Sequence, residues 1–235
     1  MLQLLPLAAV LLTSSSCVIG MRCVNGTGPV VERDLDVERF TKVIVEGSLT
    51  VKITPGDAFH VKAEGQENLI ELLDTRSQNG TWIVRTKECF STNKPFVVHV
   101  VMPVLQQAEV NGSGDILGQG TFTGELIDVA VRGSGDVKLD LRMATVNAEV
   151  TGSGDVVVTG STQALNARVV GSGDVAAKDL EARTARAEVT GSGDISVNAT
   201  GELTAVVSGS GDIKYTGGAS VNKEVIGSGD IEPLR

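Results

Sequence analysis

The sequence predicts an all-β protein, a β-solenoid whose parallel strands pair with the coils above and below. Gly-Ser-Gly-Asp occurs seven times from Gly112 onward, and successive copies start 18 to 21 residues apart. Self-similarity at so short a period indicates one structural unit that is stacked repeatedly. Apolar residues alternate on both sides of each tetrapeptide, which is the period of a strand. The unit is too short for a strand–helix–strand crossover, which needs about 30 residues.

Residues 1–16 have the features of a secretory signal peptide. The apolar run Leu2–Leu12 is too short to span a bilayer and has the length of a signal-peptide core. The three serines before Cys17 resemble a loose bacterial lipoprotein cleavage box, so Cys17 is the predicted lipidation site. Ser14 stands where such boxes usually carry an aliphatic residue, and no Lys or Arg precedes the apolar run. A buried first strand is the alternative.

We assign residues 17–32 to a lipid-anchored N-terminal tether and residues 33–235 to the β-helix domain. Residues 43–53 fit the frame of the corners, with Leu-Thr replacing the last Gly-Asp, and form a predicted eighth, degenerate corner. The 65 residues from Gly47 to Gly112 leave room for about three irregular coils. Terminal repeats are expected to be atypical because they cap the stack.

One hairpin is predicted in this irregular part. Asn79-Gly80 lies between apolar runs, which is a strong signal for a two-residue hairpin turn. Trp82 should therefore begin a strand, and the core is its favoured location.

The residues around each corner form columns. A valine precedes every first glycine by two positions, and an alanine or valine precedes it by four, with Lys223 as the exception. These columns should line a narrow interior. The positions between them should point outward, so that Glu149, Arg168 and Glu188 become vertical neighbours whose alternating charges help to fix the register.

The aspartates of the corners form a column that invites two interpretations. Stacked in register, adjacent carboxylates would lie about 5 Å apart and repel one another. Hydrogen bonds from backbone N–H groups of the turns could offset this repulsion, which is the favoured interpretation. The alternative is a ladder of bound Ca²⁺. The candidate ligands for it are Asp115, Asp136, Asp155, Asp174, Asp194, Asp212 and Asp230.

No constellation in the sequence points to catalysis. Every coil offers much the same carboxylates, and no nucleophile-elbow motif occurs. The two histidines, His60 and His99, lie in alternating apolar segments and are predicted to be strand residues. We therefore predict no enzyme, no catalytic residue and no cofactor.

The net charge and the cysteine content limit which partners and which cellular location fit the sequence. The net charge of -9 argues against nucleic acid or an anionic membrane surface as a partner. If Cys17 is lipidated, Cys23 and Cys89 remain. An exported location would permit a disulfide between them, and free thiols are the equally open alternative.

Several segments together carry a resemblance to a known family. They are Phe40-x-x-Val43-x-Val45-x-Gly47, Val51-x-Ile53-x-x-Gly56-Asp57, Asn68-Leu69-Ile70 and the serial Gly-Ser-Gly-Asp corners. From about residue 33 to the end, the chain resembles the putative auto-transporter adhesin, head GIN domain family. The resemblance implies a right-handed β-helix in an exported protein of a Gram-negative bacterium, often with a lipoprotein signal.

We therefore predict an exported, lipid-anchored structural or adhesin-like binding protein at the outer membrane or cell surface, with a periplasm-facing position as an alternative. The lipid anchor would bind the membrane, and the ligand would be a surface protein or a glycan. A carbohydrate-active enzyme on a β-helix scaffold and a calcium-stabilised solenoid are the alternative functions. The sequence predicts no ligand identity and no oligomeric state.

Overall fold

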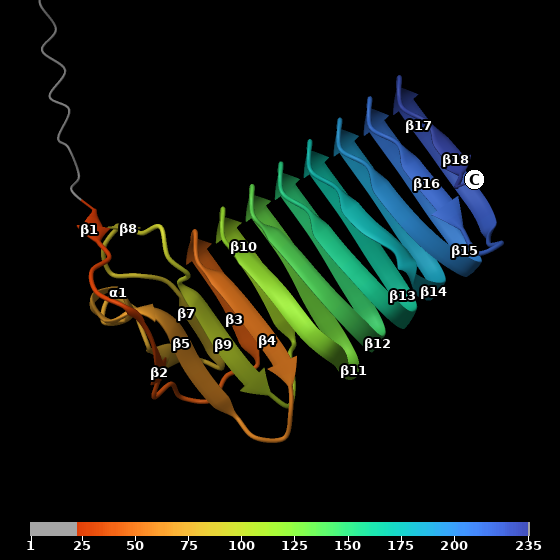
Figure 1. The fold of residues 1–235 in the computed structure, drawn as a ribbon. Helices are drawn as coiled ribbons and strands as arrows, with labels where there is room; N and C mark the ends of the chain where they lie inside the picture. Colours follow the sequence, from red (N-terminus) through yellow and green to blue (C-terminus); the bar gives the residue numbers. More distant parts are fainter. Residues whose placement is uncertain (1–22, 235) are drawn as a thin grey trace, which may run out of the picture.

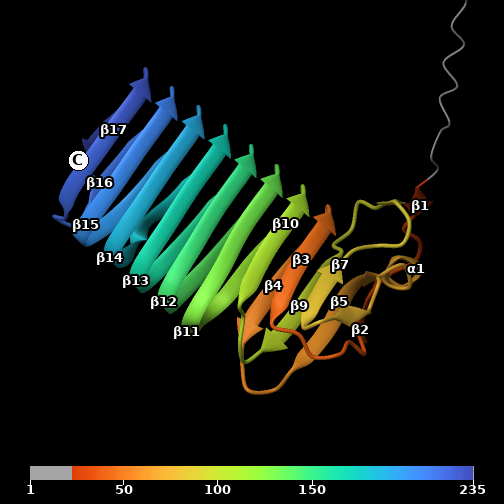
Figure 2. The same ribbon diagram turned by 180° about the vertical axis from the view of Figure 1, so that it is seen from behind.

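A computed structural model describes residues 23–234, which form a β-solenoid with a cap at its N-terminal end (Figure 1). The predicted signal peptide and Cys17 lie outside these residues. The strands of the coils stack in chain order from green to blue in Figure 1, and the view from behind shows the same order (Figure 2). The predicted fold class, a solenoid with coils of about 19 residues, is confirmed.

The solenoid coils comprise residues 107–234, and five of their strands each follow the chain through most of a coil. Their elements are β10 (Gln107–Gly112), β11 (Asp115–Gly133), β12 (Asp136–Gly152), β13 (Val156–Gly171), β14 (Val175–Gly191), β15 (Ile195–Gly209), β16 (Ile213–Thr216), β17 (Ser220–Gly227) and β18 (Ile231–Pro233). All of them pair in parallel with the preceding coil.

The register of the coils follows the columns of the sequence. First glycines pair with first glycines, as Gly133 with Gly152 and Gly152 with Gly171. The valines two positions before them are at most 1 % exposed from Val110 to Val207. Val and Ala fill this interior because two walls of one narrow coil approach closely, and burial of their apolar surface stabilises the stack by about 25 cal/mol per Å².

The cap comprises residues 23–106 and contains short strands and one helical turn. Its elements are β1 (Val24–Asn25), β2 (Val30–Asp34), β3 (Lys42–Gly47), β4 (Thr50–Pro55), β5 (His60–Gln66), α1 (Glu67–Ile70), β6 (Ser77–Gln78), β7 (Thr81–Val84), β8 (Phe90–Ser91) and β9 (Val97–Met102). No helix in residues 23–234 is long and apolar enough to cross a membrane.

The degenerate corner exists, but the three irregular coils after it do not. β3 and β4 form the corner, and β3 pairs directly with β10 in the register of Gly47 with Gly112. The intervening chain instead adds one irregular layer in parallel and then antiparallel strands. It places β7 beside β3 and β9 beside β4 in parallel, and then β5 and β2 in antiparallel pairing. These antiparallel pairs join segments that lie far apart in the chain, and they add strands beyond β4 and β9 at this end of the stack.

Aromatic packing holds the cap together. Trp82 is fully buried in β7, as favoured from the sequence, and its ring centroid lies 5.2 Å from that of Phe40. The Trp82 indole N–H donates a hydrogen bond to the Asp74 carbonyl oxygen at 2.9 Å. Asn79 and Gly80 have positive φ angles of 53° and 72° in the predicted hairpin between β6 and β7.

A disulfide and paired strands extend the folded region toward the N-terminus. Cys23 and Cys89 are bonded, which resolves the open alternative. β1 pairs with β8, and β2 pairs with β5. The region assigned to a tether up to residue 32 therefore contains folded structure from Cys23 onward, because this segment covers the edge of the cap.

Candidate functional site

Each Gly-Ser-Gly-Asp corner turns the chain between two parallel strands, and both glycines are required there. Gly133 has a φ of 139°, which favours glycine. A side chain at Gly135 would overlap the carbonyl oxygen of Gly114 in the preceding coil. The Ser134 N–H donates to the Gly112 carbonyl oxygen at 2.8 Å. The tetrapeptide is thus explained as a structural corner.

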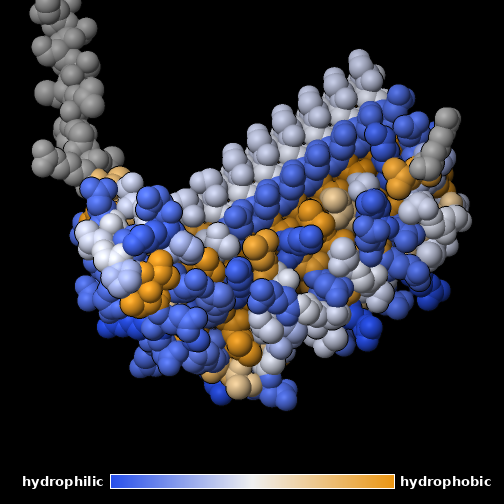
Figure 3. Space-filling model, in the orientation of Figure 1, coloured by the Kyte–Doolittle hydropathy of each residue, from blue (hydrophilic) through white to orange (hydrophobic). Residues whose placement is uncertain are grey.

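The corner aspartates form a row along one edge of the stack, visible as a continuous hydrophilic line in Figure 3. Each carboxylate except the last accepts a hydrogen bond from the backbone N–H of the aspartate in the next coil, at 2.8–3.3 Å. The accepting residues are Asp115, Asp136, Asp155, Asp174, Asp194 and Asp212. Backbone donors do offset the repulsion, but they come from the neighbouring coil rather than from the same turn.

Asp155 shows how the row balances its charges. Burial raises the pKa of the Asp155 carboxyl above its ordinary value, and the neighbouring carboxylates of Asp174 and Asp136 raise it further. The hydrogen bond from the Asp174 N–H acts in the opposite direction and favours the ionised form. The middle of the row therefore carries a modest electrostatic cost.

Within residues 23–234, no group of three or more His, Cys, Asp or Glu side chains is arranged to hold a metal ion. Ca²⁺ prefers six to eight oxygen ligands, whereas one oxygen of most corner carboxylates already accepts a backbone hydrogen bond. The calcium-stabilised solenoid stays a prediction.

A second outward surface differs from coil to coil and is the candidate binding surface. It lies on the strand segments that precede the corners, seen from β3 and β10 to β17 in Figure 2. We call it the ladder face and define it by Glu109, Asp128, Arg132, Asn147, Glu149, Asn166, Arg168, Arg186 and Glu188. Register pairs place most of these side chains one above another in two adjacent columns, and Arg132 lies in a third column beside them.

One column is a ladder of amides. The Asn147 side-chain amide donates to the Asp128 carboxylate at 2.8 Å, and the Asn166 amide donates to the Asn147 side-chain oxygen at 2.9 Å. Arg186 follows Asn166 in register. These bonds fix the orientation of planar groups before any ligand arrives, which lowers the entropic cost of binding.

The glutamates of the second column form ion pairs with arginines of the columns on either side. Arg132 pairs with Glu109, and it lies 3.7 Å from Glu149. Arg186 pairs with Glu188 on its own strand. The two glutamates that flank Arg168 in register are therefore both drawn toward other arginines.

Arg168 is left without an ion pair in residues 23–234. Glu149 and Glu188 are its register neighbours, as the sequence predicted, but neither carboxylate lies within 4.0 Å of its guanidinium nitrogens in the described structure. Its side chain is exposed. The sequence column suggested a charge ladder that fixes register; the structure instead leaves its central guanidinium available.

A shallow hollow of about 300 Å³ opens beside Arg168. The polar residues that line it are Asn147, Glu149, Asn166, Arg168, Arg186 and Glu188. It combines guanidinium donors, carboxylate acceptors and amides that do both. No aromatic side chain lines it, so stacking on a ring is not its mode of recognition.

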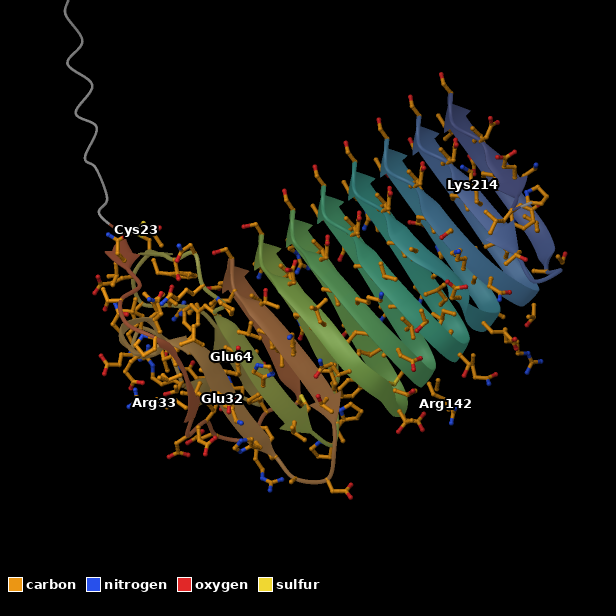
Figure 4. All side chains as sticks on the ribbon, viewed as in Figure 1. Cys23, Glu32, Arg33, Glu64, Arg142 and Lys214 are labelled. Carbon is orange, nitrogen blue, oxygen red and sulfur yellow. A yellow bond between two sulfur atoms is a disulfide. The ribbon has the colours of Figure 1, made fainter. Side chains whose placement is uncertain are left out.

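The histidines lie elsewhere, in the cap. His60 begins β5 and His99 lies in β9, which confirms both as strand residues. His99 Nε2 lies 3.1 Å from a carboxylate oxygen of Glu64, which is labelled in Figure 4, and His60 Nε2 lies 3.2 Å from Asp34. Both imidazoles thus face carboxylates on the outside of the cap and take no part in the ladder face.

Comparison with known families agrees with this architecture. A family profile described as putative auto-transporter adhesin, head GIN domain, matches residues 39–219. The chain belongs to this family. The match runs from the first corner of the cap to the turn before the last coil, so the head GIN domain includes both the degenerate and the regular corners. A search of curated proteins found no match.

Solved structures share the fold. A putative adhesin from Bacteroides fragilis NCTC 9343 is 24% identical with a TM-score of 0.85, over 90% of this chain and 100% of that chain. A putative lipid binding protein from Parabacteroides distasonis ATCC 8503 is 23% identical with a TM-score of 0.75, over 91% and 100% of the two chains. A putative adhesin from the same organism is 22% identical with a TM-score of 0.76, over 91% and 100%. The head GIN domain fold is thus shared despite low identity.

Proposed function

We propose that the protein is an exported, lipid-anchored binding protein of the cell surface that holds hydroxyl-rich glycans on its ladder face. Its membership of the head GIN domain family supports an adhesin-like function. The observation that carries the choice of surface is Arg168, an exposed guanidinium without an ion pair in the described residues, beside oriented amides and carboxylates.

Two features support export and anchoring. The Cys23–Cys89 disulfide fits an oxidising compartment, where disulfides persist. The apolar leader and Cys17 fit a lipoprotein signal. Lipidation at Cys17 would place the anchor only six residues before the disulfide, so the cap would lie next to the membrane and the coils would project from it.

The chemistry of the hollow favours an uncharged polyol over an acidic polymer. Glu149 and Glu188 can accept hydrogen bonds from sugar hydroxyls, while Arg168 can donate to hydroxyl and ring oxygens. An acidic polymer would meet both these carboxylates and the net charge of -9. A neutral glycan uses donors and acceptors together.

Binding by this surface should be weak at one site and strengthened by multiple copies. Each hydrogen bond replaces one to water and contributes about 0.5–1.5 kcal/mol, and no aromatic ring adds stacking. Many anchored copies on one cell would raise the effective concentration and give avidity without new contacts. Lipid anchoring and weak glycan binding are therefore compatible parts of one adhesive function.

The ligand is tested with the purified chain coupled to beads and applied to immobilised neutral and uronic-acid oligosaccharides. Arg168→Ala should weaken capture of the neutral glycans about tenfold, since one charge-assisted hydrogen bond is worth about 1.4 kcal/mol or more. Arg142→Ala is the matched control, because Arg142 lies on a different edge of the coils (Figure 4). Equal loss for both variants, or capture of uronic acids alone, would contradict the proposal.

Export and anchoring are tested separately in cells. Labelled palmitate should enter the wild-type protein and not a Cys17→Ala variant, and protease added to intact cells should digest the coils. Palmitate incorporation that survives Cys17→Ala would remove the anchor assignment. Protection from protease in intact cells, lost on opening the outer membrane, would place the protein in the periplasm.

A further inference from the structure

A hollow of about 650 Å³ opens on the edge of the coils that carries Arg142, opposite the corners (Figure 4). The stacking of the coils is irregular at this edge, since the register of β14 with β15 shifts between Ala177 and Glu181 and again between Ala182 and Thr184. Irregularities of this kind re-aim side chains and are frequent next to functional sites. We call this space the arginine hollow. Its exposed polar residues are Arg142, Ser161, Gln163, Glu181, Arg183 and Thr200.

Both arginines of this hollow lack an ion pair in residues 23–234. Neither guanidinium has a nitrogen within 4.0 Å of a carboxylate oxygen there, because the ion pairs of the coils involve Arg132, Lys178 and Arg186 instead. A guanidinium presents its N–H groups in a planar fork that matches the oxygens of a phosphate group. The two forks are therefore available to a phosphate in the hollow.

The arginine hollow also contains a carboxylate. Arg142, Ser161 and Glu181 follow one another in register, so they form one column across three coils. Arg183 comes two residues after Glu181 on β14, and both side chains are exposed. No ion pair joins Glu181 to either arginine in the described structure. The hollow thus presents two cations and one anion that do not neutralise one another.

The hydroxyls near these charges are already oriented by the backbone. The Thr162 hydroxyl donates to the Ala144 carbonyl oxygen at 3.1 Å, and the Thr200 hydroxyl donates to the Ala182 carbonyl oxygen at 3.3 Å. A hydroxyl whose proton is used in this way keeps its oxygen lone pairs as acceptors. Thr200 is exposed, so its oxygen and the Glu181 carboxylate give the hollow two acceptors for an ammonium group.

We propose that the arginine hollow binds a phosphoethanolamine group, at a site separate from the ladder face. The phosphate oxygens accept hydrogen bonds from the Arg142 and Arg183 guanidiniums, and the ammonium group donates to the Glu181 carboxylate. Arg142 and Glu181 lie two coils apart, a backbone separation of about 10 Å. Their long side chains reach toward the two ends of a short ligand that lies between them.

A group with both charges fits the arginine hollow better than a simple anion or cation. Phosphate alone would meet the Glu181 carboxylate and the net charge of -9, and both repel it. An amine alone would meet the two guanidiniums. Phosphoethanolamine gives each charged side chain of the hollow a partner of opposite sign, and its own charges largely cancel in the field of the whole protein.

Calorimetric titration of the purified chain with phosphoethanolamine, inorganic phosphate and phosphocholine tests the proposal. Phosphoethanolamine should bind most tightly, because inorganic phosphate lacks the ammonium group and phosphocholine lacks N–H donors. Arg142→Ala and Arg183→Ala should each weaken its binding about tenfold, which corresponds to one charge-assisted hydrogen bond. Lys214→Ala is the control, since it removes a positive charge from β16, outside the hollow (Figure 4). Equal losses for the control and the arginine variants would overturn the proposal.

Glu181→Gln separates the two halves of the ligand. This variant should bind inorganic phosphate more tightly than the wild type and lose the preference for phosphoethanolamine, because it removes the carboxylate that repels phosphate and attracts ammonium. Misfolding would weaken the binding of both ligands alike, and the urea unfolding midpoint identifies it. An unchanged preference in the folded variant would overturn the proposal, as would a wild type that does not bind phosphoethanolamine at millimolar concentration.

Vesicles distinguish a lipid headgroup from a glycan modification as the source of the group. With a lipid source, the protein should sediment with phosphatidylcholine vesicles that contain phosphatidylethanolamine, and not with phosphatidylcholine alone. With a glycan source, soluble phosphoethanolamine binds and neither vesicle does. Equal sedimentation with both vesicles would overturn the proposal.

Capture of neutral glycans through Arg168 is measured on the same protein. Failure to bind phosphoethanolamine with glycan capture intact would remove the arginine hollow alone. The reverse result would remove the ladder face alone, so the two proposals fail separately.

Discussion

The solenoid coils and the cap hold parallel strands together in different ways. In the coils, one set of contacts recurs at every corner: the Ser134 N–H bonds to the Gly112 carbonyl oxygen, and the Asp155 N–H bonds to the Asp136 carboxylate. In the cap, each stabilising feature occurs once, such as the burial of Trp82 and the Cys23–Cys89 disulfide. The coils therefore tolerate almost no change in the spacing between stacked backbones. The stability of the cap depends instead on a few large contributions that each occur once.

The cap also contains a charged cluster without an equivalent in the coils. The Asp74 carboxylate is buried and accepts two hydrogen bonds from the Arg76 guanidinium, at 2.7 and 2.8 Å. The Arg76 guanidinium holds the pKa of Asp74 well below its ordinary value. The Asp74 carbonyl oxygen in turn accepts from Trp82, so this cluster ties the β6–β7 hairpin to the aromatic core of the cap.

The largest expected effect is a loss of stability when a corner glycine of the coils is replaced. Gly154→Ala would drive a methyl group into the Gly135 carbonyl oxygen of the preceding coil, and neither backbone can move without losing register. We expect a loss of about 4 kcal/mol or more, or failure to fold, measured by urea unfolding. Ser153→Ala in the same corner is the control and should change stability by less than about 0.5 kcal/mol, because this side chain is exposed. Similar stability of both variants would refute the spacing argument.

The second prediction is that removal of the disulfide destabilises the cap and leaves the coils stable. Replacing Cys23 and Cys89 by alanine opens a link between residues 66 apart, which should cost about 2–4 kcal/mol. Native-state hydrogen exchange should then show faster exchange in the cap, while amides of β12 to β14 keep their protection. Uniform loss of protection along the chain would mean that cap and coils unfold as one unit.

The smallest expected effect concerns the aspartate row. Because the pKa of Asp155 is raised, the folded state holds this proton to a higher pH than the unfolded chain. The contribution of Asp155 to the free energy of unfolding therefore falls as pH rises from the ordinary pKa to the raised pKa. Above the raised pKa this contribution is constant. Asp155→Asn keeps the acceptor oxygen and removes the charge, so it should raise the free energy of unfolding at pH 7 by less than about 0.5 kcal/mol, with a slightly higher Tm.

The pH profile distinguishes this effect from a change in packing. The advantage of Asp155→Asn should vanish below about pH 3.9, where the ordinary carboxyl is protonated. Asp57→Asn, in the exposed loop between β4 and β5, controls for the loss of one negative charge. A Tm difference that is the same at pH 3 and pH 7 would show that the charge of Asp155 is not its cause.

Much of the solenoid could be predicted because its information is local and repeated. The valine and alanine columns fixed which side chains face inward, and the seven corners fixed the register of Glu149, Arg168 and Glu188. The degenerate corner at residues 43–53 was recognisable by the same spacing. The strands that pair in and around the cap could not be predicted in this way. β5 pairs with β9 and β3 pairs with β10, and the sequence distance between these partners does not follow the repeat.

The sequence by itself determined the repeating coil, its inward columns and the family of the chain, since these depend on residue types at a fixed period. Only the tertiary structure decided that the next coil supplies the donors to the aspartates, that Arg168 is left unpaired and that Arg142 and Arg183 line one hollow. These outcomes depend on which side chain reaches which partner when coils stack. That choice is made by distances of a few ångströms between residues that lie one coil or more apart in the chain.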